Sequence, residues 1–270
     1  MPFPKQTIYD LDSSQGKQAI VRVDFNVPLD DSTVSDTTRL KAAVPTIEHL
    51  LDEGASVLLM SHLGRPGGTV EDELRLDPVV EPLSDLLDID VRKADDVIGD
   101  SALDLSHSLK PGEVGLLENL RFHPGEKSND DEFARQLASF ADFYVNDAFG
   151  AAHRAHASIT GVPEHLRPAV AGELLYSEYE VLSEVRDNPN RPFMAILGGA
   201  KISDKLPVIE QFLDRADRVL VGGAMAYTFA LAQGKQIGDS LVEENFVEEA
   251  RSLLDHDKLV LPDDVVITPS

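Results

Sequence analysis

The stretch Ile20-Val21-Arg22-Val23-Asp24-Phe25-Asn26-Val27-Pro28 carries the strongest structural signal in this chain of 270 residues. Successive side chains of a β-strand point to opposite faces. The apolar residues at positions 21, 23, 25 and 27 would therefore share one face, and Arg22, Asp24 and Asn26 the other. A strand inside a parallel sheet is covered on both faces, so three polar groups in a row need partners. Either a bound polar ligand supplies them, or the strand lies at a sheet edge with one face in water.

Strand and helix signals alternate after this stretch and predict an α/β fold with parallel sheets. Further strands are expected at residues 55–60, 114–117, 143–145, 193–197, 218–221 and 264–268. Helices are expected at residues 76–87, 130–141 and 173–185, and a first helix should begin after Asp36 or Thr37 and end at Gly54.

Two residues of this first helix are unusual. Pro45 lies within its apolar pattern and should kink it. Arg39 lies near its start, where a cation opposes the helix dipole. Arg39 either points into solvent or is directed, together with the helix N-terminus, at an anion.

Four of the expected strands deliver an arginine or a histidine, either on the strand or just beyond its carboxyl end. These residues are Arg22, His62 with Arg65, Arg121, and His153 with Arg154. The glycine-rich loop 61–68 also follows a strand, where open α/β sheets bind ligands. The pattern predicts a cationic pocket for a small, highly charged anion. The alternative is that each cation forms a separate surface ion pair.

The break at residues 188–192 separates this half of the chain from a second strand–helix series. Its first strand runs into Gly198-Gly199-Ala200-Lys201, and Lys205 lies four residues further on, at the expected start of a helix. Glycines and a helix N-terminus suit phosphate binding, although a plain turn is the alternative. Gly222 and Gly223 follow the next strand and could admit a flat adenine or mark a tight contact between helix and strand.

Composition limits the classes of partner. The net charge of −24, from 48 acidic and 24 basic residues, is spread along the chain, so nucleic acid and anionic membranes are poor partners. The sequence has no cysteine, no signal segment and no apolar run long enough to span a bilayer, so we expect a cytoplasmic protein. The acidity indicates a salt-loving source or an acidic mesophilic protein. No dimer seam is evident, and we expect a monomer.

Several segments, in this order along the chain, resemble the phosphoglycerate kinase family. They are residues 22–28, Ser61-His62-Leu63-Gly64-Arg65-Pro66, Glu118-Asn119-Leu120-Arg121-Phe122, residues 146–150, residues 152–158, and Gly198-Gly199-Ala200-Lys201 with Asp204-Lys205. The resemblance implies two Rossmann-like parallel-sheet domains joined by a helix and a hinge. We place an N-terminal phosphoglycerate-binding domain at residues 1–170 and a partial nucleotide-binding domain at residues 171–270.

The same resemblance implies a reaction and its residues. The reaction is reversible phosphoryl transfer from 1,3-bisphosphoglycerate to ADP, giving 3-phosphoglycerate and ATP, with Mg²⁺ carried by the nucleotide. The implied substrate-binding residues are Asp24, Phe25, Asn26, Arg39, His62, Leu63, Gly64, Arg65, Arg121 and Arg154. The implied nucleotide-binding residues are Gly198, Gly199, Ala200, Lys201, Lys205, Gly222 and Gly223. Arg39, Lys201 and Lys205 would stabilise the charge of the transferred group, and no residue is assigned as a metal ligand.

The family pattern continues beyond Ser270, with a loop whose aspartate helps to hold the metal. We therefore expect the second domain to be incomplete, and the chain to turn over little by itself. A non-catalytic phosphoglycerate-binding fragment is the alternative from another functional class. A different α/β enzyme acting on sugar phosphates would not need Lys201 and Lys205.

Overall fold

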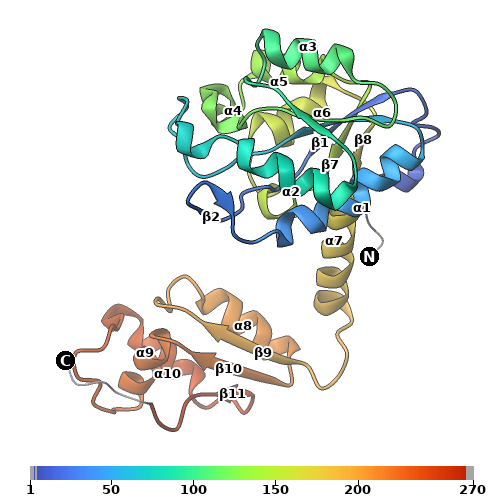
Figure 1. The fold of residues 1–270 in the computed structure, drawn as a ribbon. Coiled ribbons are helices and arrows are strands. Elements are labelled where there is room, and N and C mark those ends of the chain that lie inside the picture. The colour runs from blue at the N-terminus through green and yellow to red at the C-terminus, as the bar shows by residue number, and fades with distance from the viewer. Residues whose placement is uncertain (1–2, 4, 266–270) are drawn as a thin grey trace. The chain divides into compact units, whose positions relative to one another are not determined.

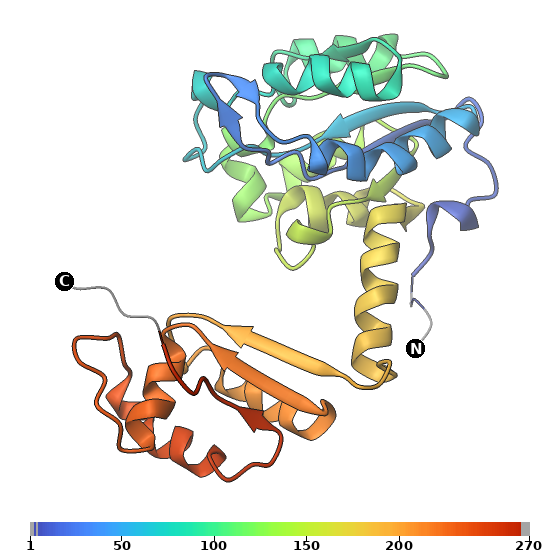
Figure 2. The same cartoon turned by 60° about the horizontal axis from the view of Figure 1, so that its bottom comes forward.

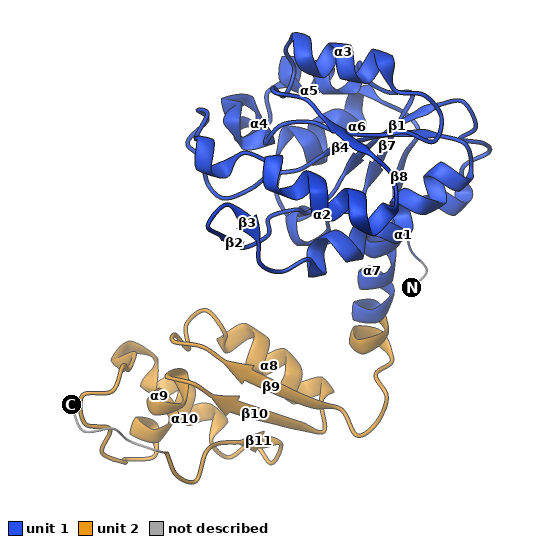
Figure 3. Ribbon diagram, viewed as in Figure 1, with its two compact units in different colours: residues 1–183 blue, residues 184–270 orange. Residues whose placement is uncertain are grey.

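The computed structural model describes residue 3 and residues 5–265, and the chain forms two compact units, residues 1–183 and 184–270 (Figures 1 and 3). The predicted helix at 173–185 is present as α7 (Glu173–Asp187). The division falls inside α7, whereas the predicted boundary after residue 170 would fall within the strand Ala169–Ala171, which belongs to the first sheet. The predicted strand 264–268 lies largely outside the described residues, and residues 264 and 265 are not in a strand.

The first unit is built on a six-stranded, wholly parallel sheet in the order β5-β6-β4-β1-β7-β8. Its strands are β1 (Gln18–Arg22), β4 (Ser56–Met60), β5 (Val91–Lys93), β6 (Val114–Leu116), β7 (Phe143–Asn146) and β8 (Ala169–Ala171). A short antiparallel hairpin, β2 (Leu29–Asp30) with β3 (Thr33–Val34), follows β1. The predicted α/β class with a parallel sheet is confirmed.

Helices cover both faces of this sheet (Figures 1 and 2). One face packs against α1 (Thr38–Asp52) and α2 (Asp77–Leu87). The other packs against α3 (Asp100–Ser108), α5 (Asp131–Ala138) and α6 (Val162–His165), with α4 (Pro124–Ser128) leading into α5. The Asp36 carboxylate accepts the Thr38 N–H at 2.8 Å, as expected at a helix start. The α1 helix continues through Pro45 to Asp52, so the proline does not end it.

The opening stretch differs from its predicted geometry. Strand β1 ends at Arg22, because its neighbours β4 and β7 end at the paired positions Met60 and Asn146. Asp24 and Asn26 therefore lie in a loop beyond the carboxyl edge and not on a strand face. The edge-strand alternative is wrong, since β1 lies in the middle of the sheet. Residues 23, 25 and 27 also lie beyond the strand, so the predicted shared strand face is wrong, although residues 21, 23, 25 and 27 all belong to one apolar core.

The second unit is a three-stranded parallel sheet in the order β11-β10-β9 with helices against it. Its elements are β9 (Met194–Gly198), α8 (Leu206–Arg215), β10 (Arg218–Gly222), α9 (Met225–Ala232), α10 (Val247–Leu253) and β11 (Leu259–Val260). The core lies between the sheet and these helices. Met194 and Ile196 point away from that core and are 52% and 76% exposed.

A buried carboxylate anchors the start of α7 to the first unit. Asp147, which follows β7, accepts hydrogen bonds from the backbone N–H groups of Leu174 (2.9 Å) and Leu175 (3.2 Å). Thr46 of α1 accepts the Glu173 N–H at 2.8 Å. Burial raises the pKa of Asp147 to about 6, although hydrogen bonds from the Thr46 side chain and from the backbone of Leu175 and Leu174 oppose the shift. The connecting helix thus begins on the same helix, α1, that carries Arg39 near its start.

Candidate active site

The cationic residues gather where the order of the strands reverses. From β1 the chain passes to β4 on one side, and it later crosses to β7 on the other side. Loops that leave neighbouring strands in opposite directions leave a crevice at the carboxyl edge, where open α/β sheets bind ligands. Arg22 ends β1, His62 lies two residues beyond β4, and Arg121 lies in the short helical turn Leu120–Phe122 after β6.

Arg22 is the buried centre of this cluster and is only 1% exposed. Its Nε donates to Ser158 Oγ at 3.0 Å, and its Nη2 lies 3.0 Å from His62 Nδ1. Its Nη1 donates to the Val23 carbonyl. Burial lowers the pKa of Arg22, and the nearby carboxylates of Glu126 and Asp24 oppose that shift.

His62 is a neutral hydrogen-bonding group and not one of the site's charges, which corrects its place in the predicted cationic pocket. A guanidinium can only donate, so His62 Nδ1 must accept from Arg22 and carries no proton. The proton of the neutral ring then lies on Nε2. Burial, followed by the charges of Arg22, Arg121 and Arg154, lowers the pKa of His62 to about 2.

Asp24 connects the centre of the cluster to α1. Its Oδ2 accepts a hydrogen bond from Arg39 Nη1, and its Oδ1 lies 4.0 Å from His62 Nδ1. The Arg39 side chain is 48% exposed, and Asp24 holds it at the start of α1. The reading that leaves Arg39 as a lone surface cation is therefore not supported, because Arg39 belongs to the cluster.

Arg121 brings a further buried charge and one orphaned donor. It is 4% exposed, and its Nη1 donates to the Gly64 carbonyl. Among the described residues its buried Nε has no acceptor. The pKa of Arg121 is lowered by burial first, then by the positive charges of Arg154 and Arg22, with a smaller contribution from Arg65. The predicted arginines thus act on one another electrostatically, which the alternative of separate surface ion pairs does not explain.

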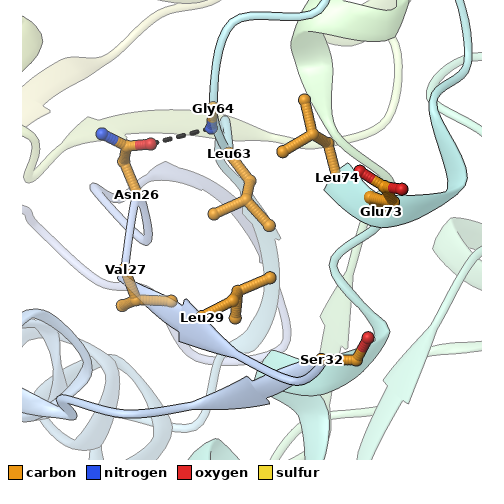
Figure 4. Close-up of a pocket in the computed structure, with 8 residues that line it drawn as sticks. All are labelled: Asn26, Val27, Leu29, Ser32, Leu63, Gly64, Glu73 and Leu74. Atoms are coloured by element: carbon orange, nitrogen blue, oxygen red, sulfur yellow. Dashed lines mark hydrogen bonds between the residues drawn. The ribbon is translucent and has the colours of Figure 1, made fainter.

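Gly64 accepts from Arg121 of this cluster and also lines a neighbouring pocket, which Figure 4 shows. Asn26 Oδ1 accepts the Gly64 N–H at 2.8 Å. Gly64 has φ +63°, and a Cβ on it would come within 2.6 Å of Leu74 Cδ2. The pocket has a volume of about 440 Å³, and its lining residues are Asn26, Val27, Leu29, Ser32, Leu63, Gly64, Glu73 and Leu74. Its wall is thus largely apolar.

Phe25 and Leu63, two of the predicted substrate-binding residues, have their side chains in the core and are 0% and 2% exposed. Their backbone N–H groups are already used. Phe25 donates to Ser61 Oγ at 2.8 Å, and Leu63 donates to Asn119 Oδ1 at 3.2 Å. These residues fix the loops that carry Asp24 and His62. Phe25 offers no side chain to a ligand, and the Leu63 side chain lines the neighbouring pocket.

The glycines of the second unit lie together at the carboxyl edge of its sheet. Gly198 and Gly222 are paired at the ends of β9 and β10. Gly223 has φ +71°, and a Cβ on it would lie 2.9 Å from both the N and the O of Gly199. The two loops therefore touch backbone to backbone, so a tight contact is present whether or not adenine binds nearby.

The segment that carries the predicted lysines lies between a strand and a helix, as expected. Helix α8 begins at Leu206, so Lys205 is its N-cap residue and Lys201 lies in the preceding loop. Both side chains are on exposed residues. The loop is held by Glu243, which accepts from Ser203 N at 2.9 Å and from Ser203 Oγ at 2.8 Å. The backbone hydrogen bond from Ser203 is the main cause that lowers the pKa of Glu243, and Lys201 also contributes.

Sequence reasoning missed three residues that support these sites: Glu126, Ser158 and Glu243. Each is polar and is held by hydrogen bonds to a loop that carries a predicted cation. Ser158 lay within a recognised segment, which was a usable signal. Glu126 and Glu243 are two among 48 acidic residues, and nothing local in the sequence distinguishes them from surface charges.

Among the residues that the structure describes (3 and 5–265), no group of three or more histidine, aspartate or glutamate side chains could hold a metal ion. The same residues contain no helix that is long and apolar enough to cross a bilayer.

The fold and the site define a two-unit α/β protein with a cluster of arginines at the carboxyl edge of its first sheet and a glycine–lysine loop on its second. Residues 8–270 match the family model described as phosphoglycerate kinase. The phosphoglycerate kinase of Moorella thermoacetica is 55% identical over 268 residues, covering 97% of this chain and 68% of that protein. The chloroplastic phosphoglycerate kinase of Volvox carteri is 52% identical, covering 97% of this chain and 59% of that protein.

A solved structure of phosphoglycerate kinase from Coxiella burnetii superposes with a TM-score of 0.82 at 36% identity, covering 96% of this chain and 66% of that chain. This chain belongs to the phosphoglycerate kinase family. It spans about two thirds of the length of the relatives that it matches.

The neutral state of His62 leads to a prediction about pH. Its ring signals, assigned by their loss in His62→Asn, should not titrate between pH 5 and 8 in an NMR experiment. The unfolded chain binds a proton at this histidine below pH 6.5, whereas the folded chain does so only near pH 2. Between these values the unfolded state binds more protons, so this histidine makes the free energy of unfolding fall as the pH is lowered. A midpoint between pH 5 and 8 would contradict the neutral assignment.

Proposed function

We propose that the first unit binds 3-phosphoglycerate or 1,3-bisphosphoglycerate, and that the second binds ADP or ATP with its Mg²⁺. The proposed reaction is the reversible transfer of a phosphoryl group from 1,3-bisphosphoglycerate to ADP. Membership of the phosphoglycerate kinase family supports it. The observation that carries the phosphoglycerate site is the convergence of Arg22, Arg121 and Arg154, with one buried Arg121 donor unpaired among the described residues.

A phosphoglycerate molecule offers what this cluster lacks. Its phosphate and carboxylate supply acceptor oxygens for guanidinium groups, which suit planar, bidentate recognition of anions. We assign Arg65, Arg121 and Arg154 to positioning the anion. His62 would donate from Nε2, and Asp24 and Asn26 would bind the hydroxyl group or orient the arginines. Phe25, Leu63 and Gly64 would contribute through the shape of their loops.

The second unit suits a nucleotide in two ways. Gly198, Gly199 and Ala200 form an exposed loop that a phosphate group could approach closely, with Lys201 and Lys205 close in sequence. A cavity of about 140 Å³ adjoins Gly223. Its lining residues include Ala226, Tyr227, Ala230, Leu261, Pro262 and Val265, an apolar surface suited to a flat base. Gly222 and Gly223 would lie beside the adenosine.

The chemistry places few demands on proton transfer. The acceptor of the phosphoryl group is already ionised at neutral pH, so no general base is needed. Catalysis then consists of positioning two anions and neutralising the charge on the oxygens of the transferred group. We assign Arg39, Lys201 and Lys205 to that charge. Asp24 already pairs with Arg39 and would orient it, without taking up a proton. Mg²⁺ enters as part of the nucleotide substrate.

We further propose that the protein is a cytoplasmic monomer with no nucleic-acid or membrane partner, adapted to high salt. The net charge of −24 supports this proposal, because anionic surfaces repel such a chain.

The role of Arg65 can be tested by calorimetry with 3-phosphoglycerate, in high salt without sulfate or phosphate. The wild type should bind, and Arg65→Ala should weaken binding by about 1–3 kcal/mol, the range for a broken charge-assisted hydrogen bond. Arg135→Ala is the matched control, because Arg135 pairs with Asp131 and Glu132 on the exposed side of α5. Equal affinity in the wild type and Arg65→Ala would remove Arg65 from the site.

Lys205 should act on the transition state more than on nucleotide binding, because charge accumulates on the transferred group. In the natural gene product that contains this chain, Lys205→Ala should lower kcat on the order of 100-fold, with a much smaller change in nucleotide affinity. Steady-state kinetics with calorimetry would measure both, and Lys110→Ala, an exposed lysine of the first unit, is the control. A raised KM for ATP at unchanged kcat would instead assign Lys205 to binding.

The acidic surface predicts a dependence on salt. Self-repulsion among the negative charges weakens as salt screens them, so the melting temperature should rise from dilute buffer to molar KCl. Thermal unfolding followed by circular dichroism at a series of KCl concentrations would measure this rise. A melting temperature that stays constant or falls with rising KCl would instead favour the alternative of an acidic mesophilic protein.

A further inference from the structure

Glu126 is a buried carboxylate that none of the assigned roles uses. It lies in α4, and its side chain is 0% exposed. Its Oε2 accepts the Ser158 N–H at 3.0 Å, and its Oε1 accepts the Ser158 hydroxyl at 2.7 Å. His156 Nδ1 lies 3.5 Å from Oε1. A buried carboxylate that accepts several hydrogen bonds has a specific environment. Its removal should therefore also disturb groups that it does not contact directly.

These contacts continue directly into the anion cluster. The same Ser158 hydroxyl that donates to Glu126 accepts from Arg22 Nε at 3.0 Å. Arg22 Nη2 in turn donates to His62 Nδ1 at 3.0 Å. Glu126, Ser158, Arg22 and His62 therefore form a continuous chain of hydrogen bonds from the interior to the proposed substrate site.

Glu126 also holds the segment that carries Arg154. Arg154 lies two residues before His156 and four before Ser158, and both of these residues contact the Glu126 carboxylate. Because the backbone just after Arg154 is fixed in this way, the Arg154 side chain has fewer positions available to it. The carboxylate thus restrains Arg154 from one side and Arg22 from the other.

The charge of Glu126 balances the arginines. Burial opposes its ionisation, but His156, Arg22 and Ser158 outweigh burial and lower its pKa. Its negative charge in turn favours the protonated forms of Arg22 and Arg121. Because Glu126 lies in the interior, it supplies this charge without occupying the acceptor position that a substrate anion would take.

We infer that Glu126 is a positioning residue of the phosphoglycerate site, which acts through Ser158 and Arg22 and does not touch the substrate. This inference rests on the proposed function, because it concerns the same anion site. The negative charge keeps two buried guanidinium groups in place before the substrate arrives. The site is therefore preorganised, and part of the ordering cost of binding is met by the fold.

Two variants separate the effect of the charge of Glu126 from the effect of its side-chain length. Glu126→Gln keeps the shape of the side chain and removes its charge, whereas Glu126→Asp keeps the charge and shortens the side chain. Glu132→Gln is the matched control, since Glu132 is a carboxylate on the neighbouring helix α5 with a side chain 63% exposed. Circular dichroism and thermal unfolding would establish first that each variant is folded.

The first readout is the ¹⁵N NMR signal of His62 Nδ1 in the protein without substrate. The hydrogen bonds that link Glu126 to His62 run through Ser158 and Arg22, so a shift of this signal in Glu126→Gln reports that chain. A purely structural role of Glu126 would leave the signal unchanged. We expect a shift in Glu126→Gln, a smaller one in Glu126→Asp, and none in Glu132→Gln.

The second readout is 3-phosphoglycerate affinity by calorimetry. Glu126→Gln should bind about 10-fold more weakly than the wild type, which is the size expected for one lost charge-assisted interaction. Glu126→Asp should recover part of the loss, and Glu132→Gln should bind like the wild type. A folded Glu126→Gln variant with wild-type His62 signals, or with affinity within 2-fold of the wild type, would overturn the inference.

The two readouts keep the inference and the proposed function apart. If the wild type does not bind 3-phosphoglycerate, the proposed function fails, while the His62 signal still decides whether Glu126 acts on the cluster. If Glu126→Gln does not fold, Ser158→Ala carries both measurements, because it removes the hydroxyl that links Glu126 to Arg22, and wild-type values in that variant would overturn the inference.

Discussion

The burial of Arg22 at the end of the central strand is the interaction on which the first unit's site depends. A buried guanidinium is tolerated only where acceptors surround it and a nearby negative charge balances it. Here Ser158 and the Val23 carbonyl are acceptors, His62 Nδ1 completes the set, and Glu126 and Asp24 supply the charge. The loops after β1, β4 and β7 are thereby tied to one side chain.

This arrangement separates the charged groups into a buried set and an exposed set. The interior positions hold charges that are paired within the protein, as with Arg22 and Glu126. Arg39 and Arg65, by contrast, are exposed, and under the proposed function they would meet the anion. His62 lies between these two sets, and it is neutral because the arginines around it make a further positive charge unfavourable.

Under the proposed function, each unit binds an anionic ligand at the end of a parallel sheet, and the two units would do so with different chemistry. The first uses long cationic side chains that converge from several strands. The second uses glycines that let two loops approach closely, with lysines on exposed residues in one of them. In each unit a carboxylate of the protein holds a loop of the site. Glu126 holds the loop at Ser158 in the first unit, and Glu243 holds the loop at Ser203 in the second. In a chain with so many acids, a few therefore stabilise the sites, and most of the others lie on the surface.

The α/β class, most of the strands and helices, and the set of basic residues at the carboxyl edge of the first sheet could be predicted from the order of the amino acids. Those features follow from local periodicity and from the common direction of parallel strands. Only the tertiary structure decided that β1 is central and ends at Arg22, because its length is set by the strands beside it. Only the tertiary structure distinguished Glu126 from the surface acids and showed His62 to be neutral. Burial and hydrogen-bond partners far apart in the chain fix the charge of a side chain, and residue spacing does not record them.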